Sequence, residues 1–185
     1  MEIIGITWTL GAGKGTIVDY LIEKKGFEHL SVRAFLIEEI KRRDMEVNRD
    51  SMVIVANDLR ATYWPAYIVE QLYQQAVLTT KNSIIESLRA IGEVEALKNK
   101  EHFHFFAVDA DPKIRYERVV IRGSETDKIS YDEFIMNEKR EMDNTDPTKQ
   151  NIARCMQMAD HVFTNDWTRE ELNAQIEEVL QKIDI

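Results

Sequence analysis

The sequence has very few of the residues that cross-link or interrupt a chain. Cys155 is the single cysteine, which excludes a disulfide framework and leads us to expect a reducing compartment, the cytoplasm. The 185 residues include only three prolines and seven glycines, and no low-complexity tract, repeat or linker is visible. Such a composition is typical of a globular protein of this length, so we expect a single domain over residues 1–185.

Long apolar runs and an excess of positive charge are also missing. No apolar run approaches the roughly 20 residues of a membrane helix, and the N-terminus lacks the basic segment of a signal peptide, so we expect no membrane partner. The 24 Lys and Arg residues are outnumbered by 33 Asp and Glu residues. Binding of nucleic acid requires a basic protein surface, so we expect no nucleic-acid partner. A local basic pocket can still hold a compact anion.

What is present is a regular alternation of strand and helix patterns. Short β-branched or aromatic runs predict strands at residues 2–8, 27–32, 82–87, 102–109 and 161–165. Helical periodicity and capping signals predict helices at residues 17–26, 34–43, 51–64, 66–78, 93–100, 112–122, 131–142, 152–158 and from 168 onward. This alternation predicts an α/β fold, a three-layer α/β/α sandwich with a five-stranded parallel sheet and ligands at the carboxyl ends of the strands.

The most informative motif is GITWTLGAGKGT, residues 5–16, between a predicted strand and a predicted helix. Gly13 and Lys14 match the phosphate-binding template G-x-x-x-x-G-K-[ST]. In such a loop, backbone N–H groups at a helix N-terminus converge on an anion, and Lys14 reaches the β- and γ-phosphates as a point charge. A glycine-rich turn without a ligand is the alternative, but the position of the motif after an apolar strand favours phosphate binding.

Two positions depart from that template, because Gly15 follows the lysine and Trp8 stands where the first glycine belongs. The sequence resembles the pattern G-x-x-G-x-G-K-G-T of the adenylate-kinase branch of the P-loop nucleoside monophosphate kinases. In that branch a glycine also follows the lysine, so Gly15 is no longer a departure. The second remains, since an indole fits poorly in a glycine conformation with φ above zero. We expect Trp8 to be the last buried residue of its strand, to tilt outward as a lid over the nucleotide, or to weaken binding.

The resemblance extends to cytidylate-kinase-like proteins, covers most of the chain, and implies a P-loop kinase fold with ATP and Mg²⁺ as cofactors. It also implies a helical acceptor-binding region at about residues 31–80 and a short helical lid at about residues 123–142. The implied nucleotide-binding residues in the loop are Gly11, Ala12, Gly13, Lys14, Gly15 and Thr16. Thr16 is in addition an implied metal-side residue.

Two charged residues follow the third predicted strand. Glu86, at the strand end beside the loop, is the candidate to hold a Mg²⁺-bound water and to face the substrate. Arg89 offers a fork of donors for the acceptor phosphate. A solvated carboxylate is the ordinary alternative for a residue at a strand end, but the neighbouring loop favours a functional role.

Further arginines follow the fourth predicted strand. Arg118 and Arg122 are four residues apart and therefore share one helix face. The resemblance places the first near the donor base and the second on the transferring phosphates, and a solvated helix face is the alternative. In the lid, Arg140 is the arginine that closure brings in, with Lys139 as the alternative.

The acceptor side matches the family less well. The family motif S-T-G-D-x-L-R corresponds to residues 31–37, where the aspartate is absent and Ile37 stands in place of the acceptor-binding arginine. Arg33 and Arg60 are the candidate replacements. We expect transfer of the γ-phosphoryl group of ATP to a nucleoside monophosphate of the AMP or (d)CMP type. A dephospho-coenzyme A kinase or another small-molecule kinase, and a nucleotide-binding protein with little turnover, are the alternatives.

Overall fold

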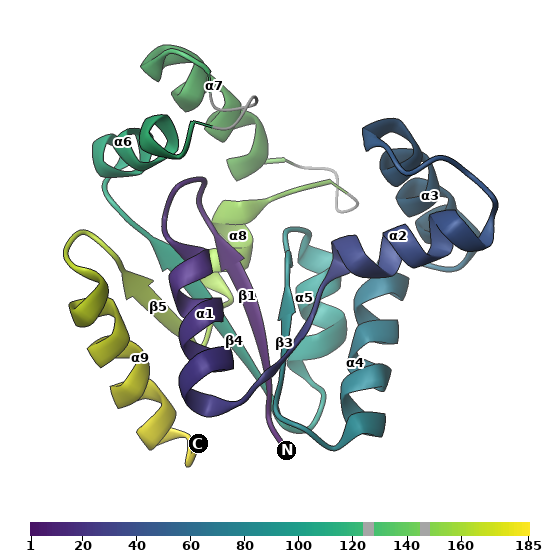
Figure 1. Ribbon diagram of the computed structural model, residues 1–185, viewed down its shortest axis with the longest axis horizontal. Coiled ribbons are helices and arrows are strands. Elements are labelled where there is room, and N and C mark those ends of the chain that lie inside the picture. The colour runs from purple at the N-terminus through teal and green to yellow at the C-terminus, as the bar shows by residue number, and fades with distance from the viewer. Residues whose placement is uncertain (124–127, 145–148) are drawn as a thin grey trace.

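The computed structural model describes residues 1–123, 128–144 and 149–185. At its centre is a five-stranded sheet with the order β2-β3-β1-β4-β5, in which all neighbouring strands are parallel. Helices cover both faces of the sheet (Figure 1), which confirms the predicted α/β/α sandwich. The strands are β1 (Ile3–Trp8), β2 (Glu28–Leu30), β3 (Ser83–Glu86), β4 (Phe103–Asp109) and β5 (His161–Thr164).

Several helices begin at signals that the sequence carries. At the predicted capping boxes, the hydroxyls of Ser130 and Thr168 each accept a hydrogen bond from the backbone N–H three residues on. Asn48 caps the third helix, where its side chain accepts from the N–H of Ser51 at 2.9 Å. The helices are α1 (Lys14–Lys25), α2 (Val32–Arg42), α3 (Arg49–Thr62), α4 (Tyr67–Thr79), α5 (Ile91–Lys98), α6 (Pro112–Arg122), α7 (Tyr131–Met142), α8 (Ile152–Gln157) and α9 (Arg169–Lys182).

Four helices, α1, α2, α3 and α5, start two or three residues earlier than the sequence pattern predicts. Helix α1 begins at Lys14 instead of residue 17, because the glycine-rich turn leads directly into its first turn. Helix α2 begins at Val32, since the side chain of Ser31 accepts a hydrogen bond from the N–H of Ala34. The predicted strand before it is correspondingly shortened to β2.

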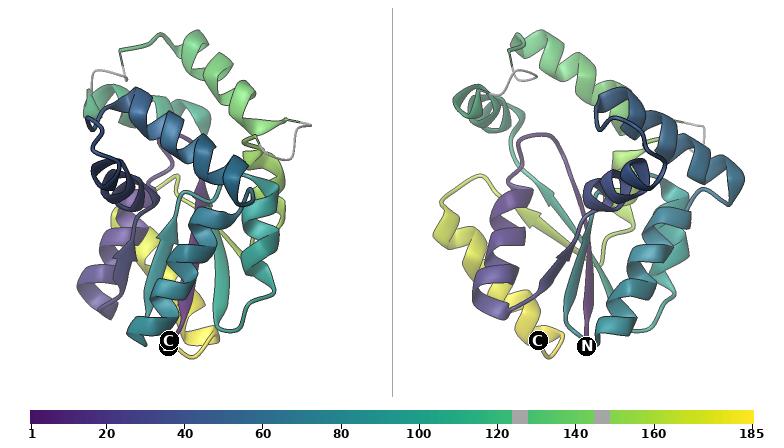
Figure 2. Two further views of the ribbon diagram at one scale, coloured as in Figure 1. Left: turned by 90° about the vertical axis from the view of Figure 1, so that its right-hand side faces the viewer. Right: turned by 45° about the vertical axis from the view of Figure 1, so that its right-hand side comes forward.

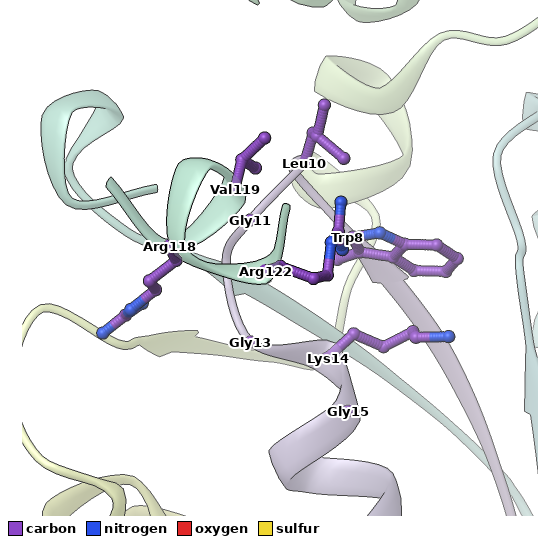
Figure 3. A pocket seen from close by; sticks show the side chains of 9 residues that line it. All are labelled: Trp8, Leu10, Gly11, Gly13, Lys14, Gly15, Arg118, Val119 and Arg122. Atoms are coloured by element: carbon purple, nitrogen blue, oxygen red, sulfur yellow. The ribbon is translucent and has the colours of Figure 1, made fainter. Parts of the chain in front are cut away.

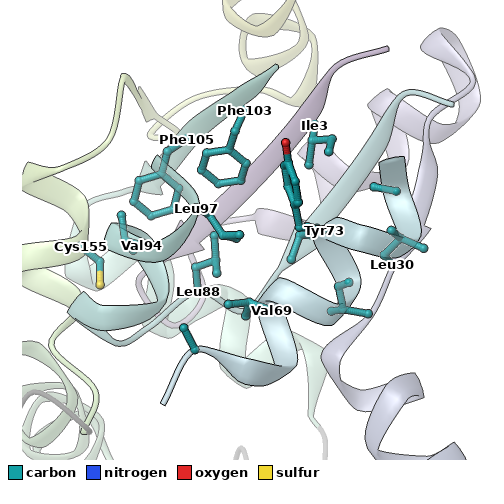
Figure 4. Packing of buried hydrophobic residues seen from close by; sticks show 14 residues of the cluster. Ile3, Leu30, Val69, Tyr73, Leu88, Val94, Leu97, Phe103, Phe105 and Cys155 are labelled. Atoms are coloured by element: carbon teal, nitrogen blue, oxygen red, sulfur yellow. The ribbon is translucent and has the colours of Figure 1, made fainter. Parts of the chain in front are cut away.

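The two faces of β1 contribute to two separate apolar cores. Ile3 packs in the core shared with α4, α5 and α8, whereas Ile4 and Ile6 pack in the core shared with α1 and α9, because successive side chains of a strand point to opposite faces. Figure 4 shows the first core, where the rings of Phe103 and Phe105 have centroids 6.4 Å apart. A third, smaller core joins α2, α3 and α4. The helices of the predicted acceptor region are therefore packed on one another.

The carboxyl ends of β1, β3 and β4 meet at one edge of the sheet. Figure 1 shows α6 and α7 above this edge on one side, and α2 and α3 on the other; the two views of Figure 2 agree. The predicted lid at 123–142 corresponds to α7 and the segment before it, of which residues 124–127 lie outside the described residues. No helix in the described part of the chain is long and apolar enough to cross a membrane.

Candidate functional site

The loop between β1 and α1 depends on two glycines in left-handed conformations. Gly11 has φ 82° and Gly13 has φ 96°, a region that side chains with a Cβ rarely adopt. A Cβ on Gly11 would also lie only 2.5 Å from the carbonyl oxygen of Arg115. On the other side, the Asn165 side-chain amide donates a 2.7 Å hydrogen bond to the carbonyl of Ala12. Close packing against α6 and the end of β5 therefore holds the loop in one shape.

A cavity of about 210 Å³ opens at this loop. Arg118 and Arg122 of α6 line it opposite the N-terminus of α1, where backbone N–H groups and the helix dipole favour an anion. The Nη1 atom of Arg118 is buried without a hydrogen-bond partner among the described residues, a costly arrangement for a guanidinium. The residues that line this cavity are Trp8, Leu10, Gly11, Gly13, Lys14, Gly15, Arg118, Val119 and Arg122 (Figure 3). We call this space the P-loop cavity.

Lys14 is engaged by a carboxylate at the end of β3. Its Nζ forms an ion pair with Oε2 of Glu86, and the other carboxylate oxygen lies 3.1 Å from Nε2 of His29 on β2. Burial, followed by the positive charge of Arg89, lowers the pKa of Lys14. Burial also lowers the pKa of His29, with Lys14 as the next cause. A phosphate that reaches Lys14 would therefore replace Glu86 as its counter-charge.

Trp8 is neither in a glycine conformation nor fully buried. It ends β1 in register with Val108 of β4, and its φ is not among the positive values of non-glycine residues in the described chain. The expectation that this position needs a glycine φ is therefore wrong. The indole lies beside two cations, with Nζ of Lys14 and Cζ of Arg89 each 4.5 Å from the ring centroid, a cation–π distance. Figure 3 shows the ring and the Lys14 side chain extending in the same direction.

A second cavity, of about 470 Å³, is lined by Arg89 and by none of the loop residues. It brings together Arg60, Arg89 and Arg140, which the sequence predicted separately, and it adds Lys149. The complete lining is Val32, Arg60, Pro65, Ser87, Arg89, Ala90, Glu93, Arg140, Glu141, Asn144, Lys149 and Gln150. We call this space the acceptor-side cavity. Its cations come from α3, α7 and the segments that follow β3 and α7.

Acidic partners orient two of these arginines. Arg89 donates to Oε2 of Glu141 at 2.9 Å and to Oε1 of Gln150 at 3.2 Å. Arg60 donates to Oε1 of Glu93 at 3.2 Å, and the second oxygen of that buried carboxylate accepts from the backbone N–H of Arg89. Arg140 has no hydrogen-bond or ion-pair partner within the described ranges. The acceptor-side cavity therefore combines two oriented arginines with the guanidinium of Arg140.

Two of the predicted cationic residues, Arg33 and Lys139, line neither cavity. Arg33 is exposed on α2 and lines neither of them, whereas its neighbour Val32 does line the acceptor-side cavity. Lys139 is likewise absent from both linings, so of the two lid residues it is Arg140 that faces the acceptor side. The interpretation of Arg33 as a replacement for the family arginine gains no support from the geometry, because the start of α2 turns it outward.

Sequence reasoning missed Arg115, a buried residue that connects three parts of the site. Only 2% of its side chain is exposed. Its Nη1 donates to the carbonyl of Leu10 at 3.2 Å, its Nε donates to the carbonyl of Ala110 at 2.8 Å, and it is paired with Glu138 of α7. The available signal was its position four residues before the buried Val119, which places it on the inward face of α6.

The strand end of β4 supplies another contact that the sequence did not indicate. The hydroxyl of Thr9 donates to Oδ1 of Asp109 at 2.5 Å, which joins the start of the loop to β4. Asp109 also accepts from the backbone N–H of Ala110 at 2.9 Å. Within the ranges described, no three His, Cys, Asp or Glu side chains are grouped so as to hold a metal ion. A divalent cation would therefore need oxygens from a ligand as well as from the protein.

The fold and the loop define the class of the chain, which has the P-loop kinase fold. The chain is similar to the crystal structure of TT1252 from Thermus thermophilus, with a TM-score of 0.65 and 17% identity over 98% of this chain and 97% of the other. It is similar to a shikimate kinase from Bacteroides thetaiotaomicron, with a TM-score of 0.63 and 12% identity over 100% and 99% of the two chains. At these identities the similarity shows the fold alone.

A family model described as an AAA domain (AAA_18) matches residues 4–149, so the chain belongs to that family. The sequence is also similar to a UPF0200 protein from Methanococcus vannielii, at 28% identity over 191 residues and 100% of both chains. A UPF0200 protein from Thermococcus onnurineus is 27% identical over 187 residues, covering 98% of this chain and 97% of that protein. These findings support a P-loop kinase, and the adenylate-kinase or cytidylate-kinase-like branch stays a prediction.

Proposed function

We propose that the protein is an ATP- and Mg²⁺-dependent phosphotransferase that moves the γ-phosphoryl group from the P-loop cavity to an acceptor in the acceptor-side cavity. The observation that carries this proposal is the shared contact at Trp8. A cation from each cavity, Lys14 from one and Arg89 from the other, lies 4.5 Å from the centroid of the same indole ring. Donor and acceptor anions bound to these two cations would therefore be neighbours.

On the donor side, the loop N–H groups and Lys14 would hold the β- and γ-phosphates. Arg122 would neutralise charge on the transferring group, and Arg118, whose Nη1 atom is buried without a hydrogen-bond partner among the described residues, would contact the remainder of the nucleotide. Such groups accelerate phosphoryl transfer by positioning and by charge neutralisation.

The residues beside Lys14 fit a bound Mg²⁺. Thr16, in the first turn of α1, and the carboxylate of Glu86 supply the hard oxygen atoms that this ion prefers, either directly or through water. When bound, Mg²⁺ would neutralise charge on the phosphate oxygens. Release of Glu86 from Lys14 as a phosphate binds would free both groups for these roles.

On the acceptor side, Arg140, Arg89 and Lys149 make the cavity suitable for a phosphate or another compact dianion. A nucleoside monophosphate of the AMP or (d)CMP type is our first candidate, and dephospho-coenzyme A or another phosphorylated small molecule is the alternative. A nucleotide-binding protein with little turnover is a second candidate function. It is favoured by the indole ring that contacts both cations.

The test is a measurement of ADP and phosphorylated product after incubation with ATP, Mg²⁺ and a panel of AMP, CMP, dCMP and dephospho-coenzyme A. We expect ADP and one phosphorylated product to form in equal amounts with one class of acceptor. Nucleotide binding in calorimetry without product for any acceptor would favour the binding-protein alternative. Absence of nucleotide binding would contradict the proposal.

A further inference from the structure

The side chain of Trp8 contacts a cation from each of the two cavities. It lines the P-loop cavity, and one of its two cationic neighbours, Arg89, lines the acceptor-side cavity. The indole is half-buried and packs on the apolar core of α1 and α9 only along part of its surface. The remaining surface faces Lys14 and Arg89, the two groups that would bind the donor and acceptor anions.

This position has a consequence for phosphoryl transfer. The attacking oxygen and the γ-phosphorus must approach to about 3–3.5 Å, and the indole lies beside the two cations that would bring them together. On its surface away from the core the ring makes cation–π contacts, which are weaker than the charge-assisted hydrogen bonds of lysine or arginine with phosphate. A phosphate bound at Lys14 draws one cation off the ring, and an anion bound at Arg89 draws off the other.

From this geometry we infer that Trp8 is a selectivity gate that shields the γ-phosphoryl group from water and opens to an acceptor when anions occupy both cavities. The inference rests on the proposed function and concerns the control of the same site. In hydrolysis, a water oxygen bonds to the γ-phosphorus, the bond to the β–γ bridging oxygen breaks, ADP leaves and a proton passes to solvent. In transfer, an acceptor oxygen takes the place of water, so the gate decides between two nucleophiles.

Substitutions at Trp8 separate gating from simple packing. Trp8→Phe keeps an aromatic ring, and Trp8→Leu keeps apolar volume against the core without a π face, while Trp8→Gly removes both. Trp167→Leu is the matched control, because Trp167 is 60% exposed in the segment between β5 and α9 and lines neither cavity. Thermal unfolding of each variant shows whether the fold is retained.

The first experiment compares acceptor-free ATP hydrolysis with acceptor-dependent transfer. For Trp8→Leu and Trp8→Gly we expect the ratio of hydrolysis to transfer to rise roughly tenfold, which corresponds to about 1.4 kcal/mol of activation free energy. Trp8→Phe and Trp167→Leu should stay near the wild-type ratio. An unchanged ratio in folded Trp8→Leu and Trp8→Gly proteins that still bind ATP would overturn the gate.

The second experiment does not depend on turnover. A protein with Trp64→Phe and Trp167→Phe keeps Trp8 as its single tryptophan, and its emission is followed with a non-hydrolysable ATP analogue, with orthophosphate, and with both. We expect the largest change when both are present. No change in emission, although calorimetry shows both ligands bound, would overturn the gate while leaving the proposed function intact. Failure to bind the nucleotide analogue at all would instead contradict the proposed function.

Discussion

The two cavities of the site are built in different ways. The P-loop cavity takes most of its lining from one short segment, whose shape depends on backbone conformation at Gly11 and Gly13. The acceptor-side cavity takes its lining from residues between Val32 and Gln150, and its shape depends on side chains that orient one another. Binding of a common donor requires only the first arrangement, whereas the choice of acceptor requires the second.

The largest effect should follow the loss of the lysine in the P-loop cavity. For Lys14→Ala we expect phosphoryl transfer to fall by roughly 10²–10³-fold for every acceptor, as when one preorganised charge-stabilising donor is removed. Lys24→Ala, at an exposed lysine of the same helix, is the control. Steady-state kinetics with saturating acceptor make the measurement. Unchanged turnover in a folded Lys14→Ala protein would remove the distinction between the two cavities.

The dependence of the first cavity on backbone shape can be tested with glycines. Gly11→Ala should lower the free energy of unfolding by about 1–3 kcal/mol, because the residue has a positive φ and its Cβ would meet the backbone of Arg115. Gly92→Ala, in α5 near the acceptor-side cavity, meets nothing within 4 Å and should leave the stability unchanged or slightly higher. Denaturant unfolding compares the two, and equal effects would contradict this account of the loop.

A smaller effect, but a more selective one, is expected from the arginines. Arg89→Gln should raise the acceptor KM roughly tenfold or more, the range expected for loss of a hydrogen bond to a charged group. Arg122→Gln should lower kcat for all acceptors, since this residue lines the P-loop cavity. Kinetics at saturating ATP with varied acceptor distinguish the two patterns. Identical small changes at both positions would indicate that these arginines are only surface residues.

The smallest effect is expected at Cys155, in the core shared by the sheet, α5 and α8. Burial raises the pKa of its thiol to about 12, and the thiolate is the reactive form. We expect labelling by a thiol reagent at about pH 8 to be slow in the native protein and fast in denaturant. Rapid labelling of the native protein would show that the core behind the acceptor-side cavity opens easily.

Much of the fold was predictable because its signals are local. The alternation of strand and helix patterns, the capping boxes at Ser130 and Thr168 and the stop at Gly26 all act within a few residues of where they stand. The boundaries that differ, such as the start of α2 at Val32, follow from a single side-chain cap. The single-domain interpretation over residues 1–185 stays a prediction.

The same distinction between local signals and tertiary packing applies to the candidate site. The phosphate-binding loop could be recognised from the sequence because its residues are contiguous and their conformations are set by glycine and by the helix that follows. Arg60, Arg89 and Arg140 could be suggested one by one, but their convergence could not, because it depends on how α3, β3 and α7 pack. Arg33 and Lys139 illustrate this limit, since nothing in the local sequence reveals that they line neither cavity.

Residue order alone therefore indicated the strand–loop–helix unit that would bind phosphate, since its glycines, its lysine and the helix that follows lie in one short stretch of chain. Tertiary packing decided the rest. It buried Arg115 between the loop and α7, and it placed the indole of Trp8 beside cations 6 and 81 residues away in sequence, Lys14 and Arg89. Such contacts depend on the order in which parallel strands lie in the sheet, which brings the ends of β1 and β3 together although many residues separate them.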